Sequence, residues 1–176
     1  AARGMRVKAI GAGHSFTGIA VAPGVLLDLS DLTGLVGADR RTGRVTLRAG
    51  TRLHQIPRLL APYGLAMPNL GDIDRQSIAG ALSTGTHGTG ARFGGIATQV
   101  VGVTLVTADG EILRVDDEHE ADLLPAVALG LGALGVGWWA AARMSRLRMI
   151  SLGGMNWRSA SSVARNCSRS RSWNSR

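Results

Sequence analysis

Apolar and polar positions alternate in several short stretches of the chain, which is the pattern of strands that bury one face. Residues 5–10 and 24–28 are predicted strands, and a third runs from about 44 to 49 after the turn ADRRTGR. Farther along, VVGVTLVTADGEILRV contains two β-branched runs joined by Asp109-Gly110, a dipeptide that strongly favours a hairpin turn. The patterning therefore predicts several strands, two of which form a hairpin.

Three other stretches have helical periodicity. TRLHQIPRLLAPYG places its apolar residues on one face, with Thr51 as the expected N-cap and Gly64 just past the end. Pro57 falls in the first turns of this segment, where a missing N–H costs least. Shorter helices are predicted at 76–83 and at about 119–129, the latter just ahead of GLGALGV. Strands, a hairpin and helices without an internal repeat predict an α+β fold.

The bulk composition suits one small domain. Of the 176 residues 45% are hydrophobic, enough for a single core that is divided at most into two small lobes. Apolar stretches are interrupted by Gly, Asp or Arg, so we expect no membrane-spanning helix. The first residues, AARGMRVKAIG, lack the apolar region of a signal peptide and resemble a helix end that runs into a strand. We therefore expect further sequence to precede them.

The net charge of +8 is unevenly distributed. All 12 acidic residues lie between Asp28 and Asp122, and residues 1–136 carry 12 Arg and Lys, so this part is neutral. The other eight basic residues are arginines near the C-terminus. A neutral main domain does not favour nucleic-acid binding. The single cysteine, Cys167, excludes an internal disulfide and fits a reducing compartment, so we expect a cytoplasmic protein.

The composition changes abruptly after Val136. Residues 137–176 contain all four tryptophans and nine serines but no acid and no lysine. They lack both strand alternation and a convincing helical face, although ARMSRLRMI could form a turn or two of basic helix. A disordered basic arm is one interpretation, and the product of a shifted reading frame is the one we favour. The ordered domain is therefore expected to span 1–136.

Candidate chemistry first occurs in GAGHSFTG, residues 11–18, directly after the first predicted strand. The third glycine, Gly18, comes two positions too late for the NAD-binding motif G-x-G-x-x-G, and Pro23 leaves no room for the helix that this motif opens. Consecutive backbone N–H groups in such a turn still form a concave site for anionic oxygens. His14 is then either a turn residue bonded to a local carbonyl or a residue that contacts a ligand.

A second loop of this kind, NLGDIDRQSIAGALSTGTHGTG, covers residues 69–90. From Ala79 to Gly90 only Leu82 and His87 have side chains larger than threonine, so the backbone can approach a flat or phosphate-bearing ligand closely. A single such loop is equally well explained as a tightly packed corner. Two loops rich in Gly, Ser and Thr, each with a histidine, favour two walls around one extended ligand that carries a pyrophosphate.

Together with GVLLDLSDL, VTLVTADGEIL and GLGALGV, the two loops resemble the FAD-binding domain of the sugar-1,4-lactone and alditol oxidoreductases of the vanillyl-alcohol-oxidase superfamily. The resemblance covers residues 2–136. It implies a PCMH-type domain of two small α/β lobes, incomplete here at both termini, with FAD as cofactor. It also implies that a CH–OH group of a sugar lactone or polyol passes hydride to flavin N5, and that electrons then pass to oxygen or another acceptor.

The same resemblance implies that the first loop wraps the FAD pyrophosphate and that His14 is a possible covalent attachment site for the flavin 8α-methyl group. The second loop would lie along the isoalloxazine and pyrophosphate. The implied cofactor-binding residues are Gly11, Ala12, Gly13, His14, Ser15, Phe16, Asp72, Ser77, Gly80, Ser83, Thr84, Gly85, Thr86 and His87. The family's substrate domain is not found, so no catalytic residue is assigned. The strand that follows Val136 in the family is also expected to be missing.

No metal site is expected, because neither His54 nor His119 has a Cys or a second His at ligand spacing around it. Three alternatives to an active flavoenzyme stay open: a catalytically inactive FAD-binding fragment, an NAD(P)-binding domain, and a nucleic-acid binder that acts through the arginine-rich tail. The substrate among lactones and alditols, the electron acceptor and the oligomeric state are not determined by these patterns.

Overall fold

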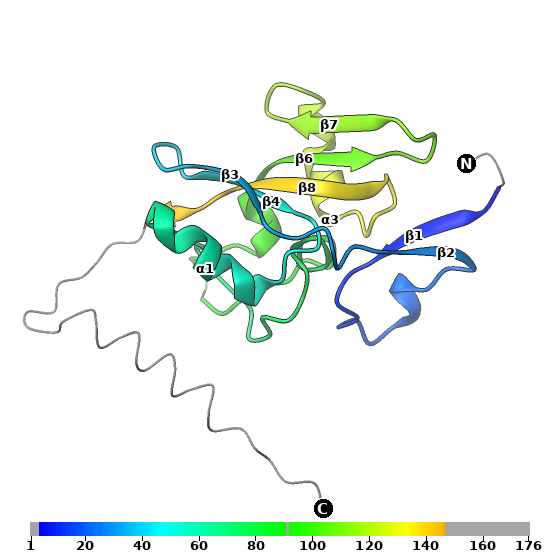
Figure 1. Ribbon diagram of the computed structural model, residues 1–176, viewed down its shortest axis with the longest axis horizontal. Coiled ribbons are helices and arrows are strands. Elements are labelled where there is room, and N and C mark those ends of the chain that lie inside the picture. Colours follow the sequence, from blue (N-terminus) through cyan, green and yellow to red (C-terminus); the bar gives the residue numbers. More distant parts are fainter. Residues whose placement is uncertain (1–3, 91, 147–176) are drawn as a thin grey trace, which may run out of the picture.

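The computed structural model describes residues 4–90 and 92–146, and it contains both helices and largely antiparallel strands, as an α+β fold does (Figure 1). The strands are β1 (Arg6–Ile10), β2 (Gly24–Asp28), β3 (Leu35–Asp39), β4 (Arg44–Arg48), β5 (Leu65–Ala66), β6 (Val100–Val106), β7 (Ile112–Asp116), β8 (Val136–Arg143) and β9 (Ser145–Arg146). The α-helices are α1 (Ile56–Leu60), α2 (Ile78–Ser83) and α3 (Leu124–Leu129). Short 3-10 helices are η1 (Gly18–Ala20), η2 (Leu53–Gln55), η3 (Ala61–Tyr63), η4 (Ile96–Gln99) and η5 (Ala121–Leu123). In this described part of the chain, no helix is both long and apolar enough to cross a bilayer.

The larger sheet has the strand order β3-β4-β8-β6-β7, and every neighbouring pair is antiparallel. β6 and β7 form the predicted hairpin, whose turn is closed by a hydrogen bond from the Gly110 N–H to Thr107 O at 3.0 Å. Gly110 has a φ of +91°, a conformation that glycine adopts without a steric penalty. The hairpin prediction is confirmed, whereas β3 was not predicted.

The central strand of this sheet, β8, crosses the boundary that was expected after Val136. It pairs with β4 on one side and β6 on the other, and its Ala140 and Ala142 are buried. The prediction of a missing strand at this point is therefore wrong. The prediction of a separate tail is also wrong for residues 137–146, although residues 147–176 of that predicted tail lie outside the described ranges.

Two features of β8 prevent its recognition as a strand from the sequence pattern. Alanine occupies its core-facing positions, and alanine favours helix over strand. In addition, the register with β6 shifts between Trp139 and Gly137, which leaves Trp138 as an extra residue on β8. Such a bulge interrupts the alternation that identifies a strand in a sequence. The suggested basic helix over ARMSRLRMI is wrong at its described start, which is strand.

The first predicted helix is broken into η2, α1 and η3, and Thr51 does not cap it. The buried Thr51 hydroxyl donates to Arg48 O at 2.7 Å and accepts from the Gly34 N–H at 3.0 Å, so it joins two other turns. The Gln55 side chain instead accepts from the Arg52 N–H at 2.9 Å. The predicted end is correct, because the segment closes at a left-handed glycine.

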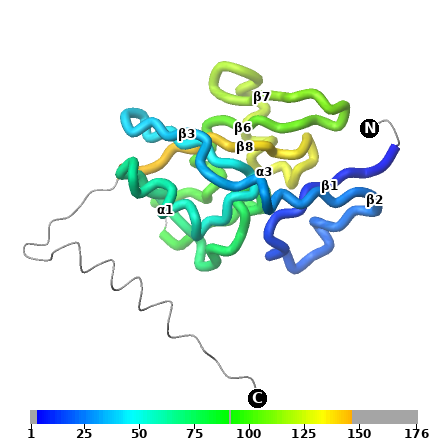
Figure 2. The backbone as a smooth tube through the Cα atoms, viewed as in Figure 1, coloured from blue at the N-terminus to red at the C-terminus, as the bar shows by residue number. Residues whose placement is uncertain are grey.

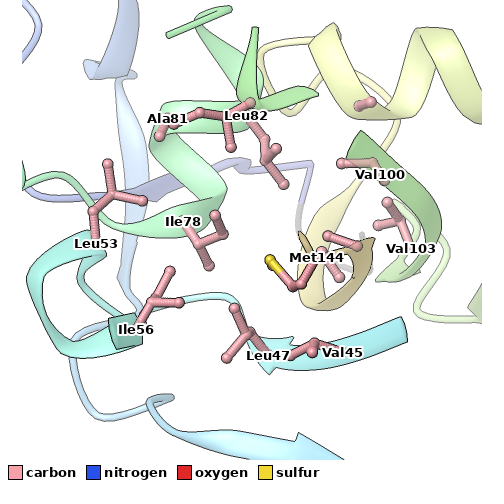
Figure 3. Packing of buried hydrophobic residues seen from close by; sticks show 14 of the residues in the cluster. Val45, Leu47, Leu53, Ile56, Ile78, Ala81, Leu82, Val100, Val103 and Met144 are labelled. Atoms are coloured by element: carbon pink, nitrogen blue, oxygen red, sulfur yellow. The ribbon is translucent and has the colours of Figure 1, made fainter. Parts of the chain in front are cut away.

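One apolar core fills the space between the five-stranded sheet and the helices (Figure 3). Leu47 of β4 points toward Ile56 of α1 and Ile78 of α2, and all three are at most 3% exposed. Burying a side chain of this size contributes about 1.5–3 kcal/mol. Since Ala81 and Leu82 also point into this core, α2 is held firmly against the sheet.

The second sheet, of β1 and β2, is parallel and lies at one end of the molecule, on the opposite side of the view from α1 (Figure 2). None of the residues in these two strands is buried. The turn after β2 joins it to the rest of the fold, where the Gly50 N–H donates to Leu32 O at 2.9 Å. A Cβ on Gly50 would lie 1.8 Å from Leu29 O, so only glycine permits this close backbone contact.

Candidate cofactor site

The first glycine-rich loop follows the carboxyl end of β1, as predicted. Gly13 has a φ of +73°, which allows the chain to turn sharply before His14. A Cβ on Gly11 would lie 2.6 Å from Ser77 Oγ and 3.6 Å from Gly80 Cα. The backbone of this loop is therefore in close contact with the start of α2, and the two predicted loops meet.

Hydrogen bonds fix the start of α2 beside that loop. Ser77 is its N-cap and accepts from the Gly80 N–H at 3.2 Å. The Ile78 N–H donates to Thr51 O at 2.7 Å, and the Ala79 N–H donates to Ala49 O at 3.1 Å. Because the apolar side of the helix faces the core, the small residues on its other side are left to line a cleft.

A third glycine-rich segment, residues 130–137, completes this cleft. Leu131 and Gly132 have φ values of +53° and +73°, and a Cβ on Gly135 would lie 2.5 Å from Val106 O. A leucine with positive φ is unusual, and such strained residues cluster at functional sites. In the sequence, GLGALGV contributes to the family resemblance but is not predicted to line the site. The glycines at every second or third position were the available signal for a wall of the site.

The three segments line an open cleft of about 150 Å³. Nine of the predicted residues line it: Gly11, Ala12, Gly13, His14, Ser15, Ser77, Gly80, Ser83 and Thr84. Lining residues that were not predicted include Lys8, Ile19, Ala20, Leu29, Gln76, Ala79, Leu131, Gly132, Gly135 and Gly137. Within residues 4–90 and 92–146 no carboxylate lines the cleft, which suits an anionic ligand.

The hydroxyl groups of the lining residues are used differently. Thr84 donates to Gly80 O within the helix at 2.9 Å, so its proton is not directed into the cleft. By contrast, the Ser15 and Ser83 hydroxyls make no hydrogen bond to another part of the described chain. Ser15 and Ser83 are consequently the better candidates for donors to a ligand.

His14 differs from the other three histidines. Ring nitrogens of His54, His87 and His119 lie 3.2, 3.0 and 2.8 Å from Asp74 O, Gly88 O and Asp116 Oδ1. The exposed His14 ring has no such partner among residues 4–90 and 92–146, and it lines the cleft. The interpretation of His14 as a turn residue bonded to a local carbonyl therefore finds no support in the structure.

Five predicted residues do not line the cleft. The side chain of Phe16 is fully exposed, and Asp72 and His87 are exposed as well. Thr86 lies behind the lining residue Gln76, with its Oγ1 3.0 Å from Gln76 Nε2. Gly85, the fifth of these residues, does not line the cleft either. The structure thus brings the first loop and the start of α2 together, but it places the THG part of the second loop outside the cleft.

The strongest local electrostatic effect lies away from the cleft, at the end of β7. The ring of His119, bonded to Asp116, is the largest cause that lowers the pKa of Asp116 well below its ordinary value of 3.8. The Glu118 N–H and the Arg114 guanidinium lower this pKa further and outweigh the effect of burial, which raises it. In the described part of the chain, no group of three or more His, Cys, Asp or Glu residues could hold a metal ion.

Comparison with known proteins identifies the class of domain. Residues 1–116 match the family described as FAD binding domain. The chain therefore belongs to this family, which confirms the resemblance of its glycine motifs, and FAD is its cofactor.

The individual proteins to which the chain is similar have more specific names than the family. L-gulono-1,4-lactone dehydrogenase of Mycobacterium tuberculosis (strain ATCC 25618 / H37Rv) is 46% identical over 136 residues, 77% of this chain and 31% of that protein. L-gulonolactone oxidase of Mus musculus is 37% identical over 131 residues, 74% and 30% of the two chains. D-arabinono-1,4-lactone oxidase of Yarrowia lipolytica is 37% identical over 137 residues, 76% and 26% of the two chains. The chain thus spans about a third or less of the length of these relatives.

Proposed function

We propose that this chain is the FAD-binding part of an oxidoreductase that acts on a CH–OH group of a sugar-1,4-lactone or an alditol. The names of its relatives support the substrate class, and the family supports the cofactor. The two sheets would correspond to two small lobes of a PCMH-type domain. The relatives are longer than this chain, which leaves room for a further domain. That domain would supply the groups that contact the substrate.

The cleft observed between the three glycine-rich segments is the feature that carries the proposal. Gly11, Gly13 and Gly135 bring backbone close to the space where a ligand would lie, and the lining contains no carboxylate to repel a pyrophosphate. The free hydroxyls of Ser15 and Ser83 add donors. These properties fit FAD. When bound, FAD supplies the chemistry, since its flavin ring accepts hydride from the substrate.

The residues of this chain would bind and orient the cofactor. The loop of residues 11–15 would surround the pyrophosphate with backbone N–H groups, and Ser77 and Gly80 would face it from α2. His14 would attach covalently to the flavin, because its exposed imidazole has no internal partner and lines the cleft. Phe16, Asp72, Gly85, Thr86 and His87 would reach the cofactor only if the second loop moved toward the cleft.

The test uses the purified chain and its visible spectrum, followed by precipitation in acid. Yellow colour that stays with the pellet, and that is lost in His14→Ala but kept in His54→Ala, is the expected result. His54 is the matched control, since its ring is bonded to Asp74 O and does not line the cleft. If acid released the colour from the unmodified chain, FAD would still be the cofactor, but the covalent role of His14 would be overturned. A chain that binds no added FAD would contradict the proposed function.

A second candidate function is binding of FAD without turnover, because no carboxylate among the described residues lines the cleft to take up a substrate proton. Both candidates hold FAD in the same cleft and differ in turnover. Flavin-loaded protein that includes the further domain, mixed with L-gulono-1,4-lactone under anaerobic conditions, distinguishes them. Bleaching of the flavin absorbance indicates an active site, and an unchanged spectrum indicates a fragment that binds FAD without turnover.

A further inference from the structure

The cleft continues along the β1–β2 sheet into a second, wider hollow of about 990 Å³. The two hollows share Lys8, Ala9, Leu29 and three glycines of the third segment, residues 130–137. Lys8 therefore lies where the two join, halfway along β1. Its neighbours in the strand, two residues away on either side, are Arg6, which lines only the outer hollow, and Ile10, which lines only the inner one.

Among the described residues, Lys8 is the only side chain with a fixed charge that lines the inner cleft. It is half-buried, and no acid of the described chain forms an ion pair with it. All 12 acidic residues of the protein lie within the described ranges, and the acids that form ion pairs do so with Arg44, Arg75, Arg114 and His119. Lys8 thus lines the cleft without a negative partner among the described residues.

We propose that Lys8 binds the diphosphate of FAD, an inference that rests on the proposed function. The glycine loops offer only backbone N–H groups and hydroxyls, whereas a diphosphate carries a net negative charge that these dipoles do not neutralise. A lysine ammonium at the end of a long stem binds phosphate as a point charge. Lys8 is three residues from Gly11, about 10 Å along an extended strand, so its stem can reach back toward the loop.

The first test measures FAD affinity by flavin fluorescence in a His14→Ala background, in which binding is reversible. Lys8→Met should weaken FAD binding about tenfold or more, the effect of losing one charge-assisted contact, and should make affinity less sensitive to salt. Lys8→Arg should restore most of the affinity. Arg58→Met is the matched control, because Arg58 is exposed on α1 and lines neither hollow. Equal affinity and salt dependence in Lys8→Met would overturn the proposal while leaving FAD binding intact.

The second test exploits the fact that Lys8 is the only lysine of the protein. An amine-reactive acylating reagent followed by peptide mapping reports the accessibility of Lys8 directly, separately from the N-terminal amine. Saturating FAD should protect Lys8 from the reagent, whereas riboflavin, which has no phosphate, should not. Equal labelling with and without bound FAD would overturn the role of Lys8. Absence of FAD binding in the first test would instead contradict the proposed function itself.

Discussion

The five-stranded sheet and the β1–β2 sheet differ in how they are stabilised. In the five-stranded sheet, Val45, Leu47 and Val115 are at most 1% exposed, and helices cover the face to which they belong. In the β1–β2 sheet no residue is buried, and Val7 and Leu26 are 48% and 47% exposed. Parallel strands are normally covered on both faces. The core and the candidate cofactor loop therefore lie in different regions, so substitutions should separate stability from binding.

Leu47→Ala should have the largest effect, because it leaves a cavity in the shared core. Removing a fully buried leucine side chain costs about 2–5 kcal/mol. Urea denaturation should show this loss in the free energy of unfolding, with FAD binding lost at lower urea in parallel. Leu26→Ala, at an exposed position of β2, is the control and should have a small effect. Equal losses for the two substitutions would contradict the difference between the sheets.

Gly50→Ala disrupts the contact between the turn after β2 and the rest of the fold. The new Cβ would lie 1.8 Å from Leu29 O, so the backbone must move, at a cost of about 1–3 kcal/mol or more. Since Leu29 also lines the cleft, FAD affinity should fall as well. Gly37→Ala, where no atom lies near the added Cβ, is the matched control and should leave FAD affinity unchanged. Unchanged FAD affinity in Gly50→Ala would show that the junction does not position the cleft.

Gly11→Ala and Ser77→Ala should each cost about 1 kcal/mol, but the two costs should not add. The Cβ added at position 11 would clash with Ser77 Oγ, which caps α2. Ser77→Ala removes both this cap and the oxygen with which the added Cβ clashes. In the double variant the clash is gone, so the loss of unfolding free energy should be smaller than the sum. Full additivity, measured by urea denaturation, would show that the first loop and α2 do not touch in solution.

Asp116→Asn should have a smaller, pH-dependent effect confined to the five-stranded region. The pKa of Asp116 is lowered in the folded state, so its stabilisation is present above its ordinary pKa of 3.8 and is lost as the pH falls toward the folded value. The difference in unfolding free energy between the two proteins should be constant at neutral pH and shrink below about pH 4. His119→Ala should reproduce part of this pattern. A difference that does not change with pH would contradict the ion-pair account.

Much of this architecture is predictable from local patterns. β1, β2, β4, the β6–β7 hairpin and α2 follow from alternation, turn residues and small-residue spacing. The failures have tertiary causes. Thr51 bonds to distant turns rather than to its own helix, and β8 is recognisable only through its pairing with β4 and β6. Pattern analysis sees one segment at a time, so it cannot detect such partners.

The candidate site shows the same limit. Two loops were predictable because each contains glycine, a hydroxyl residue and a histidine, whereas residues 130–137 contain only glycine and apolar residues. Their contribution depends on positive φ angles and on close contact with β6. Lys8 could not be identified as a site residue from the sequence either, because a single charged residue within a strand forms no motif. Only the fold places it in the cleft.

The central claim is that FAD lies between the three glycine-rich segments, and hydrogen–deuterium exchange tests it most directly. Exchange is compared for the His14→Ala protein with and without saturating FAD. FAD should slow amide exchange in residues 8–15, 76–84 and 130–137, and leave α1 and the β3–β4 hairpin unchanged. Bound FAD with protection elsewhere, or with none in these three segments, would contradict the assignment of the cleft.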